Sequence, residues 1–177
     1  MSKPSHQPSF EALLHQHRGI ILKVASVYAR DREDRLDLAQ EIRVQLWRSF
    51  GRYDASRAKA STWMYRIALN VAISYRRRDG ALLTGRIEPL EEHHLDSLGD
   101  APGEREEDER LAALYAFIGE LDALNRALIL LYLEERSYAE IAEVLGISET
   151  NVATKIGRIK QKLRGQMTAA ETHTTRA

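Results

Sequence analysis

The sequence predicts an all-α fold in which two small helical domains are joined by a flexible acidic linker. Apolar residues recur at three- and four-residue steps before residue 79 and after residue 108, which is the period of amphipathic helices. No stretch alternates apolar and polar residues for long enough to indicate a sheet. Residues 79–108 lose the helical period and concentrate glycine, proline and acidic residues, as linkers do. The predicted organisation is a disordered N-terminus at 1–9, a first domain at 10–78, the linker at 79–108, a second domain at 109–165 and a C-terminal tail at 166–177.

Charge is distributed unevenly along the chain, although its 26 Lys and Arg residues balance its 26 Asp and Glu residues. Residues 1–78 carry 15 basic against 7 acidic side chains, and residues 79–109 carry 2 against 11. Residues 150–177 are basic again, with 6 against 1. The two basic parts predict binding to a polyanion, although solvated helix faces would give the same pattern.

The composition excludes several classes of protein. Because it has no cysteine, the 177-residue chain has no disulfide, thiolate metal site or thiol nucleophile. No apolar run approaches the ~18 residues of a membrane span, and residues 1–9 lack the apolar core of a secretory signal. We therefore expect a cytoplasmic protein without membrane insertion.

The first domain is expected to contain three or four helices. Apolar spacing places them at about residues 10–30, 36–50 and 62–78, with a polar turn at 31–34 and a basic loop at 51–61. The inner face of the second helix is expected to consist of Leu38, Ala39, Ile42, Leu46 and Trp47, and that of the third of Trp63, Met64, Ile67, Ala68, Val71 and Tyr75. Because Trp63 lies on this inner stripe, we interpret it as a core residue rather than a ring that stacks on a base.

The second domain is expected to contain four helices, at about 111–119, 123–134, 138–145 and 149–163. Ser137 and Glu140 have the spacing of a capping box, and Gly146 suits a left-handed C-cap. A short helix, a glycine turn and a longer helix with a basic outer face predict a helix-turn-helix. A helical hairpin with a solvated basic face is the alternative.

The outer face of the last helix carries side chains suited to DNA. Recognition helices place N-terminal residues on base edges and later cations on phosphates. The face shows Thr150 together with the base-edge or groove candidates Asn151, Thr154, Lys155 and Arg158, followed by the phosphate candidates Lys160, Lys162 and Arg164.

Three motifs follow one another along the chain in the order found in one protein family. They are the run from Asp37 to Ile42 (DLAQEI), the run from Ala60 to Asn70 (ASTWMYRIALN), and Ser137 to Ala142 (SYAEIA) followed by Gly146-Ile147-Ser148 and the basic helix. Together they resemble an extracytoplasmic-function (ECF) sigma factor of the sigma-70 family, over nearly all of residues 10–164. The resemblance implies a chain that carries RNA polymerase to a restricted set of promoters, reads their −10 and −35 elements, promotes melting and performs no covalent chemistry.

The resemblance also implies the partners and the residues that meet them. Polymerase would be bound through the clamp coiled coil of its largest subunit and through its flap, and an anti-sigma protein would hold the factor inactive. The polymerase-binding candidates form a polar stripe opposite Leu38, Ile42 and Leu46: Asp37, Gln40, Glu41, Gln45 and Arg48. The −10 candidates are Arg52, Tyr53, Arg57, Lys59, Arg66, Asn70 and Arg77, and the −35 candidates are Thr150, Asn151, Thr154, Lys155, Arg158, Lys160 and Lys162. Ala60 departs from the family, which commonly has an aromatic residue there.

The linker predicts how the two domains would act together. As a free coil its 30 residues would span ~30 Å, whereas promoter elements two helical turns apart are ~70 Å apart. We therefore expect polymerase to hold the linker extended, and the free protein to bind promoters weakly.

Two other functions fit parts of the sequence. A stand-alone regulator could combine the helix-turn-helix with a helical sensor domain, and it would bind promoters without polymerase. An enzyme would need a built site, and the best metal-like group is Glu91, Glu92, His93 and His94, with His15 and His17 elsewhere. Adjacent histidines in a flexible acidic stretch do not preorganise a metal site. We therefore expect no catalytic, cofactor-binding or metal-binding residues.

Overall fold

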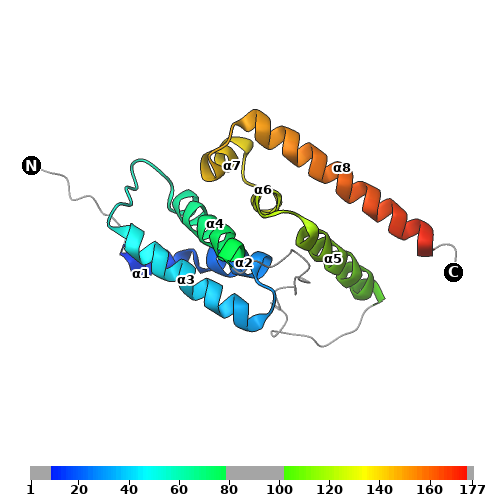
Figure 1. The fold of residues 1–177 in the computed structure, drawn as a ribbon, viewed down its shortest axis with the longest axis horizontal. Coiled ribbons are helices and arrows are strands. Elements are labelled where there is room, and N and C mark those ends of the chain that lie inside the picture. Colours follow the sequence, from blue (N-terminus) through cyan, green and yellow to red (C-terminus); the bar gives the residue numbers. More distant parts are fainter. Residues whose placement is uncertain (1–8, 79–101, 175–177) are drawn as a thin grey trace, which may run out of the picture. The chain divides into compact units, whose positions relative to one another are not determined.

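The computed structural model describes residues 9–78 and 102–174, and the side-chain surroundings within the second range from residue 110 to 166 and at Thr168. These residues form eight helices and no strand, which confirms the predicted all-α class (Figure 1). The contacts divide the chain into two compact units, residues 1–90 and 91–177. Within the described residues, no helix has the length and apolar character needed to cross a membrane.

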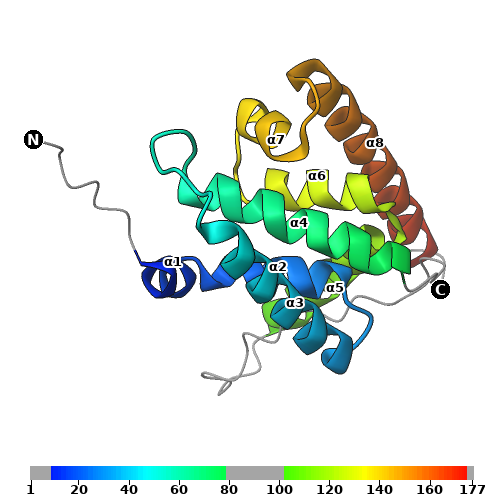
Figure 2. The same cartoon turned by 60° about the vertical axis from the view of Figure 1, so that its left-hand side comes forward.

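The first unit has a core of three helices that pack pairwise: α2 (Arg18–Tyr28), α3 (Arg32–Phe50) and α4 (Ala60–Arg78) (Figure 2). The largest side chains in this core have almost no exposed surface: Ile21, Tyr28, Leu38, Ile42, Leu46, Met64, Tyr65 and Leu69. This core holds the outer faces of α3 and α4 in fixed positions.

The single helix predicted for residues 10–30 is two helices. Helix α1 (Phe10–Gln16) ends at His17, whose φ of −115° and ψ of 21° interrupt the helix before α2 begins. The break lets Phe10 pack against Trp47 and Phe50 at the end of α3, with ring centroids 5.1 Å and 5.4 Å away.

Helix α3 differs from the prediction at both ends. The expected polar turn at 31–34 is the N-cap and first turn of the helix, because the Asp31 side chain accepts a hydrogen bond from the backbone N–H of Asp34. Trp47 was predicted to be buried, and this is wrong, because 64% of its surface is exposed. The buried line of α3 consists of Leu38, Ala39, Ile42 and Leu46, as predicted.

Helix α4 buries a different stripe from the predicted one. Met64 and Ala68 are buried as expected, but the other buried members are Thr62, Tyr65, Leu69, Ala72 and Arg76. Ile67, Val71 and Tyr75 are half-buried. The shift arises because α4 packs against both α2 and α3, so the buried arc is wider and turned relative to the predicted stripe.

The second unit consists of α5 (Pro102–Glu120), α6 (Ala123–Leu133), α7 (Tyr138–Leu145) and α8 (Glu149–Thr174). Helix α8 packs on α6 and α7, and α6 also contacts α5 and α7. The core includes Phe117, Leu128, Leu131, Ile141, Val152 and Ile156. A buried arginine completes it: Arg126 donates from Nη2 to the carbonyl oxygens of Gly119 (2.6 Å) and Leu121 (3.2 Å).

The predicted helix-turn-helix is confirmed in its local details. Ser137 and Glu140 form the capping box at the start of α7, and Gly146 ends α7 in the left-handed conformation with φ of 68°. Ser148 Oγ then accepts a hydrogen bond from the backbone N–H of Asn151 at 3.2 Å, which starts α8.

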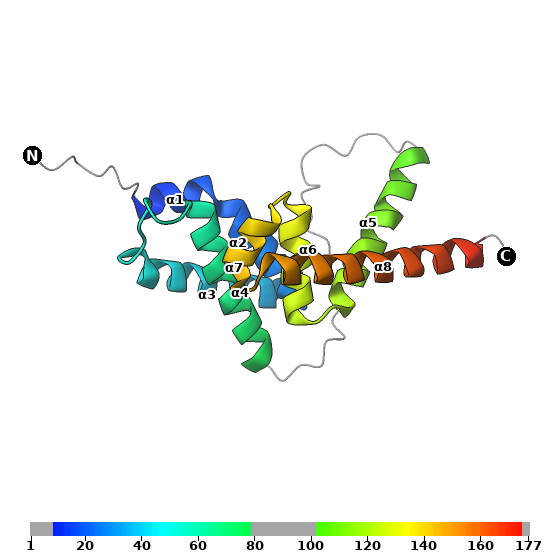
Figure 3. The same ribbon diagram turned by 90° about the horizontal axis from the view of Figure 1, so that it is seen from above.

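The predicted linker and tail contain more helix than expected. Residues 102–108 belong to α5, and 166–174 continue α8, which runs as one helix in Figure 3. Residues 79–101 of the predicted linker lie outside the described residues, as do 1–8 and 175–177.

Candidate functional site

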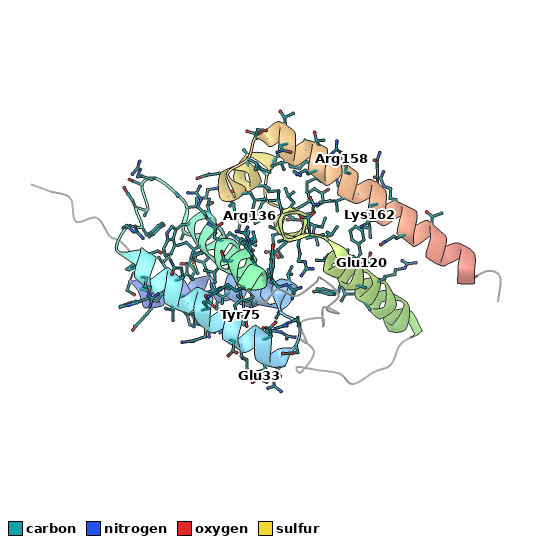
Figure 4. All side chains as sticks on the ribbon, viewed as in Figure 1. Glu33, Tyr75, Glu120, Arg136, Arg158 and Lys162 are labelled. Atoms are coloured by element: carbon teal, nitrogen blue, oxygen red, sulfur yellow. The ribbon has the colours of Figure 1, made fainter. Side chains whose placement is uncertain are left out.

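The outer face of α8 is formed by short polar side chains followed by cations. Val152, Ile156 and Ile159 fix the orientation of the helix by packing inward. Of the predicted −35 residues, Thr150, Asn151, Thr154, Arg158 and Lys162 are exposed, whereas Lys155 and Lys160 are half-buried. Arg158 and Lys162 follow one another along this helix (Figure 4).

Three of these side chains have contacts inside the protein, and the weakest is that of Lys162, whose Nζ lies 6.0 Å from the centroid of the Phe117 ring. Thr154 Oγ1 donates a hydrogen bond to the backbone oxygen of Thr150 at 2.9 Å, so its hydroxyl oxygen is left to accept from a base amino group. Lys160 Nζ lies 4.3 Å from the centroid of the Tyr132 ring, a cation–π contact that holds the ammonium group against α6.

The loop between α3 and α4 is shaped by one aspartate. Asp54 Oδ1 accepts hydrogen bonds from Ser56, through Oγ at 2.6 Å and through the backbone N–H at 2.9 Å. These bonds, the side-chain one first, hold the pKa of Asp54 below its usual value. The turn leaves the three predicted −10 cations of the loop, Arg52, Arg57 and Lys59, on the surface.

Tyr53 does not present its ring to solvent. Only 6% of its surface is exposed, its ring centroid lies 4.7 Å from that of Trp63, and its hydroxyl donates to the backbone oxygen of Ala58 at 3.3 Å. Burial, and secondarily the charge of Asp54, raises the pKa of this phenol. Tyr53, one of the predicted −10 candidates, is therefore buried in this structure. Trp63 is half-buried between Tyr53 and Phe50, which agrees with its interpretation as a packing residue.

The outer face of α4 continues the basic surface of the loop. The three predicted residues Arg66, Asn70 and Arg77 are all exposed. Their steps of four and seven place them on one side of the helix, opposite the core.

The outer face of α3 carries an apolar stripe that the sequence analysis missed. Leu36, Val44 and Trp47 expose 63%, 38% and 64% of their surface. At steps of eight and three they lie in one row with the exposed Gln40. The predicted polar stripe runs beside this row: Asp37 and Arg48 are exposed, and Glu41 and Gln45 are half-buried.

Glu41 is already engaged within the first unit. Its carboxylate pairs with Arg78 at the end of α4. The guanidinium of Arg78 also lies 5.9 Å from the centroid of the Tyr75 ring. Glu41 therefore joins α3 to α4 in addition to lying beside the apolar row.

No group of three His, Asp or Glu side chains that could hold a metal ion occurs among the residues that the structure describes. Glu91, Glu92, His93 and His94 lie outside those residues, and His15 is exposed at the end of α1.

Comparison with known proteins identifies both units. Residues 13–81 match the family described as Sigma-70 region 2, and residues 111–163 match Sigma-70, region 4. The ECF RNA polymerase sigma factor SigW of Bacillus subtilis is 31% identical over 139 residues, which cover 74% of each chain. The chain belongs to the ECF sigma factors of the sigma-70 family.

Two further comparisons agree with this assignment. The ECF RNA polymerase sigma factor SigE of Mycolicibacterium smegmatis is 29% identical over 174 residues, covering 96% of this chain and 66% of SigE. The solved structure of CnrH in complex with the cytosolic domain of CnrY matches with a TM-score of 0.62 and 25% identity, over 90% of this chain and 88% of CnrH.

The family assigns a class of partner to the surfaces of this sigma factor. Sigma factors direct core RNA polymerase to promoters, so polymerase and promoter DNA are its partners. Sequence reasoning omitted the exposed apolar residues on α3: Trp47 was assigned to the core, and Leu36 and Val44 were given no role. The signal that could have found them is their register: Leu36, Val44 and Trp47 lie about half a turn away from Leu38, Ile42 and Leu46.

Proposed function

We propose that this ECF sigma factor binds core polymerase through the outer face of α3, reads the −10 element through the 51–59 loop and α4, and reads the −35 element through α8. The apolar stripe on α3 is the observation that carries the proposal. Three large apolar side chains in one exposed row, two of them more than 60% exposed, are typical of a protein-binding surface rather than of a solvated helix.

The polymerase surface combines this stripe with the polar residues beside it. Leu36, Val44 and Trp47 would be removed from water on binding, which supplies affinity. Asp37, Gln40 and Arg48 lie at the rim, where charged and amide groups set orientation. Glu41 and Gln45 are less accessible and contribute mainly by holding the helix in place. The partner on polymerase is the clamp coiled coil, and the second unit binds the flap.

The −10 surface consists of cations and one amide around the loop. Arg52, Arg57, Lys59, Arg66 and Arg77 bind phosphates, and Asn70 can donate to and accept from a base edge. Tyr53 and Trp63 support the loop from inside. The buried Tyr53 ring is therefore assigned to loop shape and not to base stacking.

The −35 surface uses the N-terminal half of α8. Thr150, Asn151, Thr154, Lys155 and Arg158 face the bases or the groove, and Lys162 binds a phosphate. Lys160 is half-buried and lies 4.3 Å from the Tyr132 ring, whereas Lys162 is exposed and lies 6.0 Å from the Phe117 ring, so Lys160 contributes less than Lys162.

An anti-sigma protein is the proposed regulator. The support is the solved CnrH structure, whose partner is the cytosolic domain of CnrY. Because this chain matches 88% of that CnrH chain, a cytosolic anti-sigma segment is the partner class we propose for it. Because a sigma factor acts on promoter DNA together with polymerase, we propose the cytoplasm as its location.

The test is transcription in vitro with purified chain, bacterial core polymerase and fragments of the genome that encodes the chain. We expect discrete 5′ ends that depend on the chain and share a −10 and a −35 element. Tight promoter binding by the chain alone, with no dependent 5′ ends, would contradict the proposal and favour a stand-alone regulator.

A further inference from the structure

Gly157 lies in the interior of α8, where neither the backbone conformation nor side-chain packing requires a glycine. It is exposed, and Gly146 is the one described glycine with a left-handed φ, so the backbone of Gly157 is one that any residue can adopt. A Cβ built at Gly157 would meet no neighbouring atom within 4 Å. Glycine weakens a helix interior relative to alanine, so this position gives up helix stability without a packing gain.

The position of Gly157 is on the DNA-facing side of the helix. Thr154 precedes it by three residues, Arg158 follows it, and both are exposed. Ile156 and Ile159 on either side point into the core. A side chain at residue 157 would therefore extend from the same surface that presents the −35 candidates.

The neighbouring side chains require a close approach. Thr150, Asn151 and Thr154 are short, so they reach base edges only when the helix backbone lies near the DNA. Thr154 is held closer still, because its hydroxyl donates to the oxygen of Thr150 at 2.9 Å. The absence of a side chain at Gly157 is compatible with the close approach of α8 that these short side chains need.

We infer that Gly157 is a positioning residue for −35 recognition: its missing side chain lets the α8 backbone lie against the promoter, so that Asn151 and Thr154 reach the bases. The inference rests on the proposed function, because it requires that α8 reads the −35 element. Glycine is the residue that permits close approach of a backbone to a ligand.

The experiment compares Gly157→Ala with Gly165→Ala in the full-length chain. Gly165 is also exposed in α8 with no neighbour within 4 Å of a built Cβ, and eight residues place it ~12 Å further along the helix. Hydrogen exchange of the α8 amides should slow by about two- to fivefold in both variants, because alanine favours the helix. This readout also establishes that both variants fold.

The second readout is binding of the holoenzyme, core polymerase plus chain, to a promoter with an intact −35 element. Gly157→Ala should weaken binding by about 5- to 100-fold, the range expected for one methyl group forced into a close contact. Gly165→Ala should leave it unchanged. The slope of affinity against salt should be the same for all three proteins, because no phosphate-binding cation is lost.

A more stable α8 together with weaker promoter binding in Gly157→Ala alone would establish the inference. Equal promoter binding by the two variants would overturn it while leaving the proposed function intact. If the wild-type holoenzyme shows no dependence on a −35 element, both the inference and that part of the proposed function are wrong.

Discussion

The hydroxyl of Tyr75 donates a hydrogen bond to Asp34 Oδ1 across 2.6 Å, joining the end of α4 to the first turn of α3. Asp34 Oδ2 accepts two further bonds from Arg30, from the backbone N–H at 2.9 Å and from Nε at 3.3 Å. Burial alone would raise the pKa of Asp34. The bond from Tyr75 and the bonds and charge of Arg30 outweigh it, and the pKa lies below its usual value. One carboxylate therefore ties α3 to α4 and to the turn between α2 and α3.

Replacing Tyr75 with phenylalanine should weaken the first unit. The substitution removes one hydrogen bond to a buried carboxylate, and bonds of that kind contribute about 1.5–3 kcal/mol. Both tryptophans of the chain, Trp47 and Trp63, lie in this unit, so the midpoint of urea unfolding followed by tryptophan fluorescence reports its stability. Tyr138→Phe in the second unit is the control and should leave that midpoint unchanged. A midpoint for Tyr75→Phe equal to that of the control would show that the bond contributes nothing.

The same carboxylate makes the first unit sensitive to acid. The folded pKa of Asp34 is lower than the ~3.9 of an unfolded chain, so the ionised form is favoured by folding. This contribution is fully present above pH ~3.9 and is lost as pH falls through the folded pKa. We expect the fluorescence-detected stability of wild type to fall more steeply below pH 4 than that of Asp34→Asn. Parallel curves for the two proteins would contradict the assignment.

Local interactions made the helix-turn-helix predictable from sequence. The capping box of Ser137 and Glu140 and the left-handed Gly146 involve residues within one turn of each other, so short motifs specify them. The start of α5 was missed although its signals were present. Pro102 at the first helical position and acidic residues in the turn after it favour a helix N-terminus, but the same residues were interpreted as linker.

Long-range packing and position within the unit explain the other errors. Tyr53 was proposed as a −10 candidate because it lies in a basic loop, and its ring packs on that of Trp63, ten residues away on α4. Trp47 was assigned to the core because it is apolar, but it lies at the edge of the unit, with 64% of its surface exposed and its ring 5.1 Å from that of Phe10. Sequence periodicity identifies apolar faces, but it does not say whether a face meets its own chain or a partner.

Arg126 should be required for stability of the second unit. Only 2% of its surface is exposed, and its guanidinium donates to the carbonyl oxygen of Gly119, near the end of α5, and to that of Leu121, just after it. Arg126→Met keeps much of the side-chain volume but leaves those oxygens without this donor, and we expect a loss of about 2–4 kcal/mol. Hydrogen exchange of amides in α5 and α6 measures it, because the tryptophans report the other unit. Arg110→Met, at an exposed site on α5, should show wild-type exchange. Equal protection in both variants would refute the role.

Glu135 should be replaceable by glycine with a gain in stability. Its φ of 56° is left-handed, a conformation that disfavours residues with a Cβ by about 1–2 kcal/mol. Glycine removes that strain. Its greater conformational freedom in the unfolded chain reduces the gain in folding stability by ~0.5–1 kcal/mol. The net expectation for Glu135→Gly is a gain of up to ~1.5 kcal/mol, seen as slower exchange of the amides in α6 and α7. Glu134→Gly, at a φ of −81°, should show no gain. Faster exchange in Glu135→Gly would mean that the Glu135 side chain contributes more than its backbone strain removes.

The α3 stripe can be tested by truncating one exposed leucine. Leu36 is 63% exposed, and Leu22 on α2 is 40% exposed, so Leu36→Ala and Leu22→Ala make the same chemical change on two surfaces of one unit. If α3 binds polymerase, Leu36→Ala should weaken binding to core polymerase by about tenfold, because most of a leucine side chain is no longer removed from water. Leu22→Ala should bind as wild type, and both variants should keep the wild-type urea midpoint because neither residue is in the core. Equal affinities for core polymerase would mean that the stripe lies outside the interface, and the polymerase surface would have to be sought among the polar residues beside it.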